Sequence, residues 1–271
     1  MPELTLPGAR IHYEVEGRDD GPAVVLIHAG VASLRMWDDL VPSLAATHRI
    51  LRYDTRGFGR SMADDGDFSD LDDLLAVMDA AGFEKATLIG ASRGGRIAID
   101  AAVEAPRRVT GLVTIGSTPS GFPDTELTER ENELFDELDE LLAAGRFDEM
   151  YRREAELWAV GPTRDVVEVD DHFLQLAYAL NAENVKQATV KARPLQIEPP
   201  AYDRTVDIEV PALFVIGEHD LAGEIAATEY LLSTVPDSTE ARFPDSAHLP
   251  SVERPEEFAR ALGGWLAEHG L

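Results

Sequence analysis

Ser92 lies between glycines in the stretch Gly90-Ala91-Ser92-Arg93-Gly94, which fits the pattern G-x-S-x-G. Glycines at these positions allow a sharp turn that leaves the serine hydroxyl exposed. The structural alternative is a glycine-rich turn in which the serine caps a helix. Because a serine hydroxyl is a weak nucleophile at its ordinary pKa, a catalytic role requires a histidine base and a carboxylate that orients the histidine.

His248 and Asp220 are the best candidates for that base and that carboxylate. His248 lies in the loop before the last predicted helix, and Asp220 follows an apolar predicted strand. Glu218 is the alternative acid, and His219 is less well placed than His248 to act as the base. The chain order Ser92, Asp220, His248 is the nucleophile, acid, base order of one particular fold. We expect structural or solvent-exposed roles, and no metal site, for His12, His48, His172 and His269.

A tetrahedral intermediate also needs backbone N–H groups directed at its oxyanion. One donor is expected to be the N–H of Arg93, directly after the serine. The second is expected from the loop that follows the apolar stretch "VVLIH", where Gly30 lets the backbone approach a substrate closely. Ala29 and Val31 are the alternative positions for this second donor.

Short apolar stretches alternate with helical patterns along most of the chain, which predicts a mostly parallel sheet with helices on both faces, an α/β fold. An early antiparallel strand is predicted at 9–17. The later predicted strands are 23–28, 49–54, 85–91, 109–117, 212–220 and 239–244. The predicted helices of this part are 37–46, 70–82, 96–106, one between the last two strands, and 255–270.

The alternation stops after residue 117, where the sequence has helical patterns at 127–145 and 172–188 and no convincing strand. We therefore predict a core domain formed by residues 1–121 and 196–271, and an inserted all-helical cap formed by residues 122–195. An insertion between two strands of one sheet is expected to cover the edge where those strands end.

The 271 residues carry a formal net charge of -27 and include no cysteine. Such a negative potential repels nucleic acid and anionic membranes, and the absence of cysteine excludes disulfides and thiolate catalysis. The first residues do not resemble a signal peptide and no segment is apolar enough to cross a bilayer, so we expect a cytoplasmic protein, a monomer or homodimer, without a membrane partner. Adaptation to salt is an alternative explanation of the acidity.

Five of these stretches together resemble the α/β-hydrolase superfamily over essentially the whole chain. They are "LIHAG", "YDTRGFGRS", "GASRGG", "GEHD" and "AHLPSVERPEEF". Within this superfamily the chain resembles small cofactor-free carboxylesterases, enol-lactonase-like enzymes and ring-cleavage-product hydrolases. The resemblance implies a Ser-His-Asp triad, an acyl-enzyme formed from a small ester or lactone, a helical cap over the pocket and no cofactor.

Several alternatives remain open at this level. Ala29 stands where many relatives have a second glycine, and "GFGRS" begins like a dinucleotide-binding fingerprint but has Met62 in place of the third glycine. The serine argues against the carboxylate nucleophile of haloalkane dehalogenases and epoxide hydrolases. The functional alternatives to an esterase are an enol-lactonase, a carbon–carbon bond hydrolase, a cofactor-free perhydrolase and a ligand-binding receptor-like module.

The side chains that would shape the pocket are the least defined by the sequence. Arg93 could bind a substrate carboxylate or form a salt bridge with the acidic surface. Because the overall charge disfavours anionic substrates, neutral esters are expected. The residues proposed to line the acyl pocket, each of which could instead belong to the core of the cap, are Phe122, Tyr151, Leu157 and Trp158.

Overall fold

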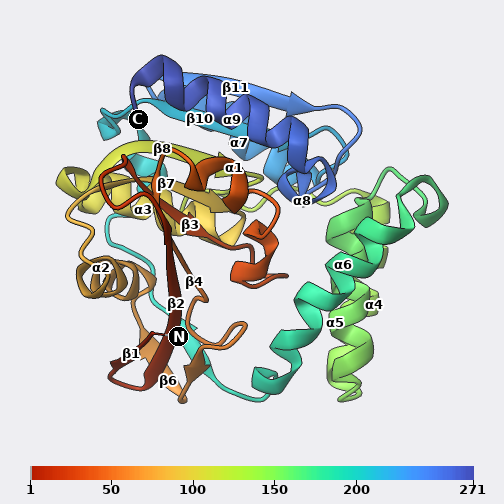
Figure 1. The fold of residues 1–271 in the computed structure, drawn as a ribbon. Coiled ribbons are helices and arrows are strands. Elements are labelled where there is room, and N and C mark those ends of the chain that lie inside the picture. Colours follow the sequence, from red (N-terminus) through yellow and green to blue (C-terminus); the bar gives the residue numbers. More distant parts are fainter. Residues whose placement is uncertain (1) are drawn as a thin grey trace.

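The computed structural model describes residues 2–271, and its centre is a nine-stranded sheet (Figure 1). The strand order is β1-β2-β4-β3-β7-β8-β10-β11, with β5 paired to β2. Strands β1 and β2 are antiparallel to each other and β2 is antiparallel to β4, while the pairs from β4 to β11 are parallel. The strands are β1 Glu3–Leu6, β2 Ala9–Gly17, β3 Ala23–Ile27, β4 Arg49–Tyr53, β5 Met62–Ala63, β7 Ala86–Ala91, β8 Val109–Ile115, β10 Ala212–Gly217 and β11 Ser238–Phe243.

Both faces of the sheet are buried under helices, as the continuous apolar strands predict. Successive residues of a strand point to opposite faces, and in β3 Val24 and Leu26 belong to one apolar cluster while Val25 and Ile27 belong to the other. The first cluster contains residues of α1 Val41–Ala45, α8 Pro250–Glu253 and α9 Pro255–His269, and the second contains residues of α2 Asp70–Ala80, α3 Arg93–Glu104 and α7 Ala222–Thr234. The predicted α/β fold class is therefore confirmed.

The segment between β8 and β10 is mainly helical, and its helices are α4 Glu129–Ala143, α5 Phe147–Val160 and α6 Asp171–Ala182. Figure 1 shows them as a green group beside the central sheet. Thr128 and Glu131 form a capping box that begins α4, because each satisfies a backbone N–H that a helix start leaves unpaired. The division into a core of 1–121 and 196–271 and a cap of 122–195 stays a prediction.

Three local features differ from the predicted elements. The insertion contains a strand, β9 Ala192–Pro194, which pairs in parallel with β6 Gly66–Phe68. With three residues, one of them proline, β9 is too short for a strand pattern to show in the sequence. The helix predicted at 37–46 is divided into a 3-10 turn at Leu34–Trp37 and α1, because Pro42 is tolerated only in the first turn of a helix. Strand β1 was not predicted.

Candidate active site

Ser92 occupies the turn between β7 and α3 in a strained backbone conformation. Its φ is 51° and its ψ is -117°, and it is the one non-glycine residue with positive φ within residues 2–271. A Cβ atom on Gly90 would lie 2.2 Å from the carbonyl oxygen of Gly94, and one on Gly95 would lie 1.9 Å from Oγ of Ser117. The turn is therefore so tight that only glycine fits on its inner side. Backbone strain of this kind is concentrated at functional sites.

Asp220 and His248 are brought together although they are 28 residues apart. Nδ1 of His248 lies 3.0 Å from Oδ1 and 2.8 Å from Oδ2 of Asp220, and the two residues are 4% and 1% exposed. The other ring nitrogen, Nε2 of His248, is buried and has no hydrogen-bond partner within residues 2–271. Glu218, the alternative acid, is exposed, and Nδ1 of His219 lies 2.7 Å from Oγ1 of Thr163.

The electrostatic environment of His248 suits a base that becomes transiently protonated. Burial alone would lower its pKa, but the charge and hydrogen bond of Asp220, with a further contribution from Glu224, raise the pKa of His248 above its usual value. Since Asp220 can only accept at Nδ1 when ionised, the neutral ring carries its proton there and leaves Nε2 as an acceptor. This is the tautomer that a general base for a serine hydroxyl requires.

Gly116 makes room for this pair at the end of β8. A Cβ on Gly116 would lie 2.7 Å from Oδ2 of Asp220 and 2.9 Å from Nδ1 of His248, and its φ is +52°. Gly116 could not be identified from the sequence, because its closeness to both residues arises from the pairing of β8 with β10.

The loop after β3 places Gly30 close to the start of α3. A Cβ on Gly30 would lie 3.9 Å from Cβ of Arg93. His28 donates from Nδ1 to the carbonyl oxygen of Ala29 at 2.7 Å and accepts at Nε2 from the N–H of Thr55 at 2.9 Å. Because the C=O and N–H of a trans peptide point in opposite directions, this bond to the Ala29 carbonyl fixes the direction of the Gly30 N–H.

The alternative donors in this loop differ in their availability. The N–H of Ala29 already donates to Sδ of Met36 at 3.3 Å. The N–H of Gly30 makes no hydrogen bond with any residue in the described range 2–271. The N–H of Arg93, the first residue of α3, cannot bond within its own helix. Burial lowers the pKa of His28, which favours the neutral ring. The role of His28 in positioning this loop was not identified from the sequence.

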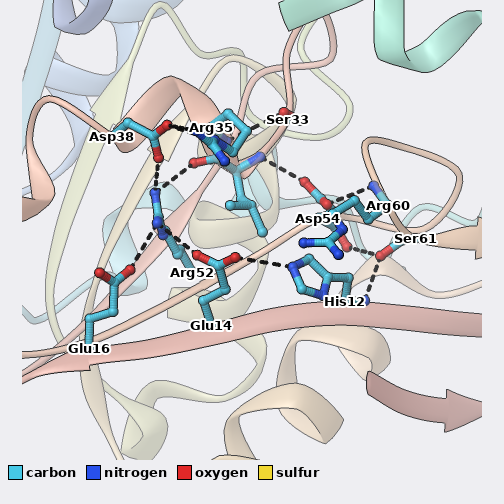
Figure 2. Close-up of polar contacts among 11 residues, drawn as sticks. His12, Glu14, Glu16, Ser33, Arg35, Asp38, Arg52, Asp54, Arg60 and Ser61 are labelled. Carbon is cyan, nitrogen blue, oxygen red and sulfur yellow. Dashed lines mark hydrogen bonds and ion pairs between the residues drawn. The ribbon is translucent and has the colours of Figure 1, made fainter. Parts of the chain in front are cut away.

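Asp54, directly after β4, holds the far end of the same loop (Figure 2). Its carboxylate accepts from the N–H of Leu34 at 2.7 Å and from the N–H of Arg60 at 2.8 Å. Its carbonyl oxygen accepts from Oγ of Ser61 at 2.7 Å, and that Oγ accepts from the N–H of His12 at 2.8 Å. The stretch "YDTRGFGRS" thus anchors the loop that carries Gly30.

The Arg93 side chain forms a buried ion pair. Its Nη2 lies 2.5 Å from Oδ1 of Asp70, the first residue of α2, and its guanidinium carbon lies 5.1 Å from the centre of the Phe58 ring. Its Nε is buried without a hydrogen-bond partner in the described part of the chain. Burial raises the pKa of Asp70, and the charge of Arg93 opposes that rise. Arg93 therefore pairs with an interior acid and not with the acidic surface.

The four predicted pocket residues lie in different surroundings. Tyr151 lines a cavity with Arg93. Leu157 is packed among Leu134, Leu138 and Leu221, and Phe122 packs on Tyr202 and Tyr230. Trp158 packs directly on His248, with ring centres 4.2 Å apart, and its carbonyl oxygen accepts from the N–H of His248 at 3.2 Å.

Two further polar residues near the site were not identified from the sequence. Asn184, 1% exposed, accepts from the N–H of Gly59 at 2.9 Å and donates to the carbonyl oxygen of Ala32 at 3.2 Å. It therefore joins the segment directly after α6 to the loop that carries Gly30. Glu224 accepts from Oγ1 of Thr118 at 2.8 Å, and burial raises its pKa to about 7.

The part of the chain that the structure describes has neither a metal-binding cluster nor a membrane-spanning helix. No group of three or more His, Asp or Glu side chains is arranged to hold a metal ion between residues 2 and 271. Over the same range, none of the helices combines the length and the apolar character needed to span a bilayer.

Comparisons with known proteins agree with this architecture. The family model of the alpha/beta hydrolase fold matches residues 22–255. A pimeloyl-[acyl-carrier protein] methyl ester esterase of Aeromonas hydrophila is 28% identical over 257 residues, covering 92% of this chain and 96% of the relative. A 3-oxoadipate enol-lactonase of Acinetobacter baylyi is 22% identical and covers 96% and 94%. A solved structure described among carboxylesterases of Nitrososphaera gargenis has a TM-score of 0.80 at 21% identity and covers 99% of both chains.

Proposed function

Because the chain belongs to the α/β-hydrolase family and is an enzyme of that family, we propose that it is a serine hydrolase that cleaves carboxylic esters of small molecules. Ser92 is the nucleophile, His248 the general base and Asp220 the residue that orients the base. The observation that carries the proposal is the positive φ of Ser92 at the turn between β7 and α3. This backbone conformation is energetically costly, and a serine that only capped a helix would not need it. Because other loops at this edge carry a buried acid–histidine pair, a catalytic role accounts for the strain.

In the acylation half of the reaction, Oγ of Ser92 attacks the ester carbonyl while Nε2 of His248 accepts its proton. The carbonyl oxygen becomes an oxyanion, and the N–H groups of Gly30 and Arg93 donate to it. Asp220 stabilises the imidazolium that forms. His248 then gives the proton to the alcohol oxygen as the bond to the acyl carbon breaks, which leaves an acyl-enzyme on Ser92.

In the deacylation half, a water molecule takes the place of the alcohol. Nε2 of His248 accepts a proton from the water as its oxygen attacks the acyl carbon. The second tetrahedral intermediate collapses, the carboxylic acid leaves and Oγ of Ser92 recovers its proton from His248. No redox step is involved, and no group beyond the chain and water is required by this sequence of steps.

The hydroxyl of Ser92 makes no hydrogen bond to His248 within residues 2–271, where Nε2 of His248 has no partner. Hydrogen bonds between catalytic groups are often formed only when substrate is bound. Trp158 covers the imidazole ring, so we expect substrate entry to involve displacement of this side chain or of α5.

Lactones are a second candidate substrate class, because a lactone is a cyclic ester and needs the same proton transfers. The similarity to the Acinetobacter baylyi enol-lactonase favours this candidate. A lactone keeps its alcohol attached to the acyl group after ring opening, so the two classes are separated by offering ring and open-chain esters of equal carbon number.

The test is intact-mass spectrometry after incubation with a fluorophosphonate, beside turnover of p-nitrophenyl esters of increasing acyl length. We expect one adduct per chain, located on Ser92, and hydrolysis of the shorter esters. Ser92→Ala should abolish both. Hydrolysis that survives unchanged in the Ser92→Ala variant would refute the proposal, as would the absence of both labelling and turnover in folded wild-type protein.

A further inference from the structure

Arg93 contributes its backbone to the proposed oxyanion hole and its side chain to the wall of a cavity. This cavity has a volume of about 190 Å³ and is also lined by Phe58, Tyr151 and Asn184. A second cavity, of about 120 Å³, is lined by Asp70. The ion pair between Arg93 and Asp70, whose side chains are 14% and 11% exposed, therefore stands between the two cavities.

The charges around the larger cavity cancel. Its other cationic residue, Arg56, makes two hydrogen bonds of 2.8 Å to the carboxylate of Asp73. Arg93 is neutralised by Asp70 through one hydrogen bond, of 2.5 Å from Nη2 to Oδ1. The guanidinium keeps a buried donor without a partner, because Nε of Arg93 is buried and has no hydrogen-bond partner among the described residues. A buried donor without a partner is costly, and an oxygen atom of a bound ligand would satisfy it.

The mechanism determines which part of an ester enters this cavity. His248 must give a proton to the leaving alcohol, so the alcohol lies on the side of His248. A separate cavity of about 350 Å³ is lined by Trp158, which packs on His248, and by Thr118 and Glu224. This cavity of about 350 Å³ suits the alcohol. The cavity lined by Arg93, the residue that follows Ser92, suits the acyl group.

We propose that Asp70 is a specificity-determining residue, which neutralises Arg93 so that the acyl cavity accepts uncharged acyl groups with an oxygen acceptor and excludes carboxylates. The inference rests on the proposed esterase function. Without the charge of Asp70, the guanidinium would be available to a substrate carboxylate, with which it can form strong charge-assisted hydrogen bonds. The same fold would then prefer the opposite class of acyl group.

The experiment compares two p-nitrophenyl esters of equal length, mono-p-nitrophenyl adipate and its uncharged terminal carboxamide analogue. The wild type should have the higher kcat/KM for the carboxamide, by about tenfold or more. Asp70→Asn should shift the ratio of the two kcat/KM values towards the carboxylate by roughly 10- to 100-fold. Combining Asp70→Asn with Arg93→Met should cancel that shift, because the methionine keeps the backbone N–H and removes the guanidinium.

Asp72→Asn is the matched control, because Asp72 lies in the same helix and is exposed. It removes the same charge and should leave the ratio unchanged. The proposal is overturned if the wild type prefers the carboxylate, if Asp70→Asn leaves the ratio unchanged, or if Asp72→Asn shifts it equally. Asp70→Ala replaces Asp70→Asn if the latter does not fold. If wild-type protein neither hydrolyses the carboxamide ester nor reacts with a fluorophosphonate, the esterase proposal fails instead.

Discussion

Replacing Asp220 by asparagine tests the proposed catalytic machinery at its most sensitive point. The carboxylate accepts from Nδ1 of His248 at 2.8 Å in a buried site. Two unit charges about 4 Å apart attract by about 4 kcal/mol at an effective dielectric constant of about 20. If that attraction stabilises the imidazolium in the transition state, its loss lowers kcat by about 1000-fold. The asparagine amide can also donate to Nδ1, which would place the ring proton on Nε2 and block proton transfer from Ser92.

The assay is hydrolysis of a short p-nitrophenyl ester between pH 5 and pH 9. In the wild type, kcat/KM should fall as the pH decreases through the raised pKa of His248, because only the neutral ring is a base. In Asp220→Asn, burial is no longer opposed by the carboxylate, so this fall should move to lower pH. Glu218→Gln, at an exposed position, is the control and should change neither quantity. A kcat for Asp220→Asn within tenfold of wild type would refute the reasoning, and a large loss in Glu218→Gln would identify Glu218 as the acid.

Three other substitutions have defined outcomes. Gly116→Ala should lower kcat about 100-fold, because the new Cβ would lie 2.7 Å from Oδ2 of Asp220. Gly264→Ala is the control and should leave kcat unchanged, because no atom lies within 4 Å of its new Cβ. Equal kcat values for the two variants would contradict the prediction. Asp100→Asn should raise the free energy of unfolding at pH 8 by roughly 3 kcal/mol, because burial raises the pKa of Asp100 to about 6 and its ionised form destabilises the fold above that pH. Urea unfolding should find little gain at pH 4, and an equal gain there would refute the cause. Asn184→Leu should lower the free energy of unfolding by roughly 2 to 4 kcal/mol, because it leaves a backbone N–H and a backbone C=O buried without partners; an unchanged thermal midpoint would show that Asn184 does not fasten the cap.

The elements that position the candidate site could be predicted because their signals are local. Buried parallel strands are continuous apolar stretches, and the turn after β7 is marked by its own glycines. Parallel strands have their carboxyl ends at one edge of the sheet, so Ser92, Asp220 and His248 could be assigned to that edge without coordinates. Strand β9 could not, since its pairing with β6 joins segments more than a hundred residues apart along the chain.

The contacts that fix the side chains could not be predicted, because each depends on how distant elements pack. No feature of the sequence near Arg93 indicates that Asp70, at the start of another helix, takes its charge. Likewise, only the structure shows that the N–H of Ala29 is not free to donate to an oxyanion, because it donates to Sδ of Met36. The sequence therefore predicted which strand ends carry the candidate residues, while the choice among neighbouring groups required their packing.

The position of His248 is linked to α5 as well as to the loop after β10 that carries Asp220. Asp220 holds Nδ1 of His248 from the core side, while the carbonyl oxygen of Trp158 accepts from the backbone N–H of His248 at 3.2 Å and the Trp158 ring covers the imidazole. A movement of α5 would therefore change the contacts of the base together with the access to it. In an enzyme arranged in this way, substrate binding and proton transfer are not independent. Substitutions in α5 that alter its position should consequently change kcat as well as KM, whereas a cap that only admitted substrate would affect KM alone.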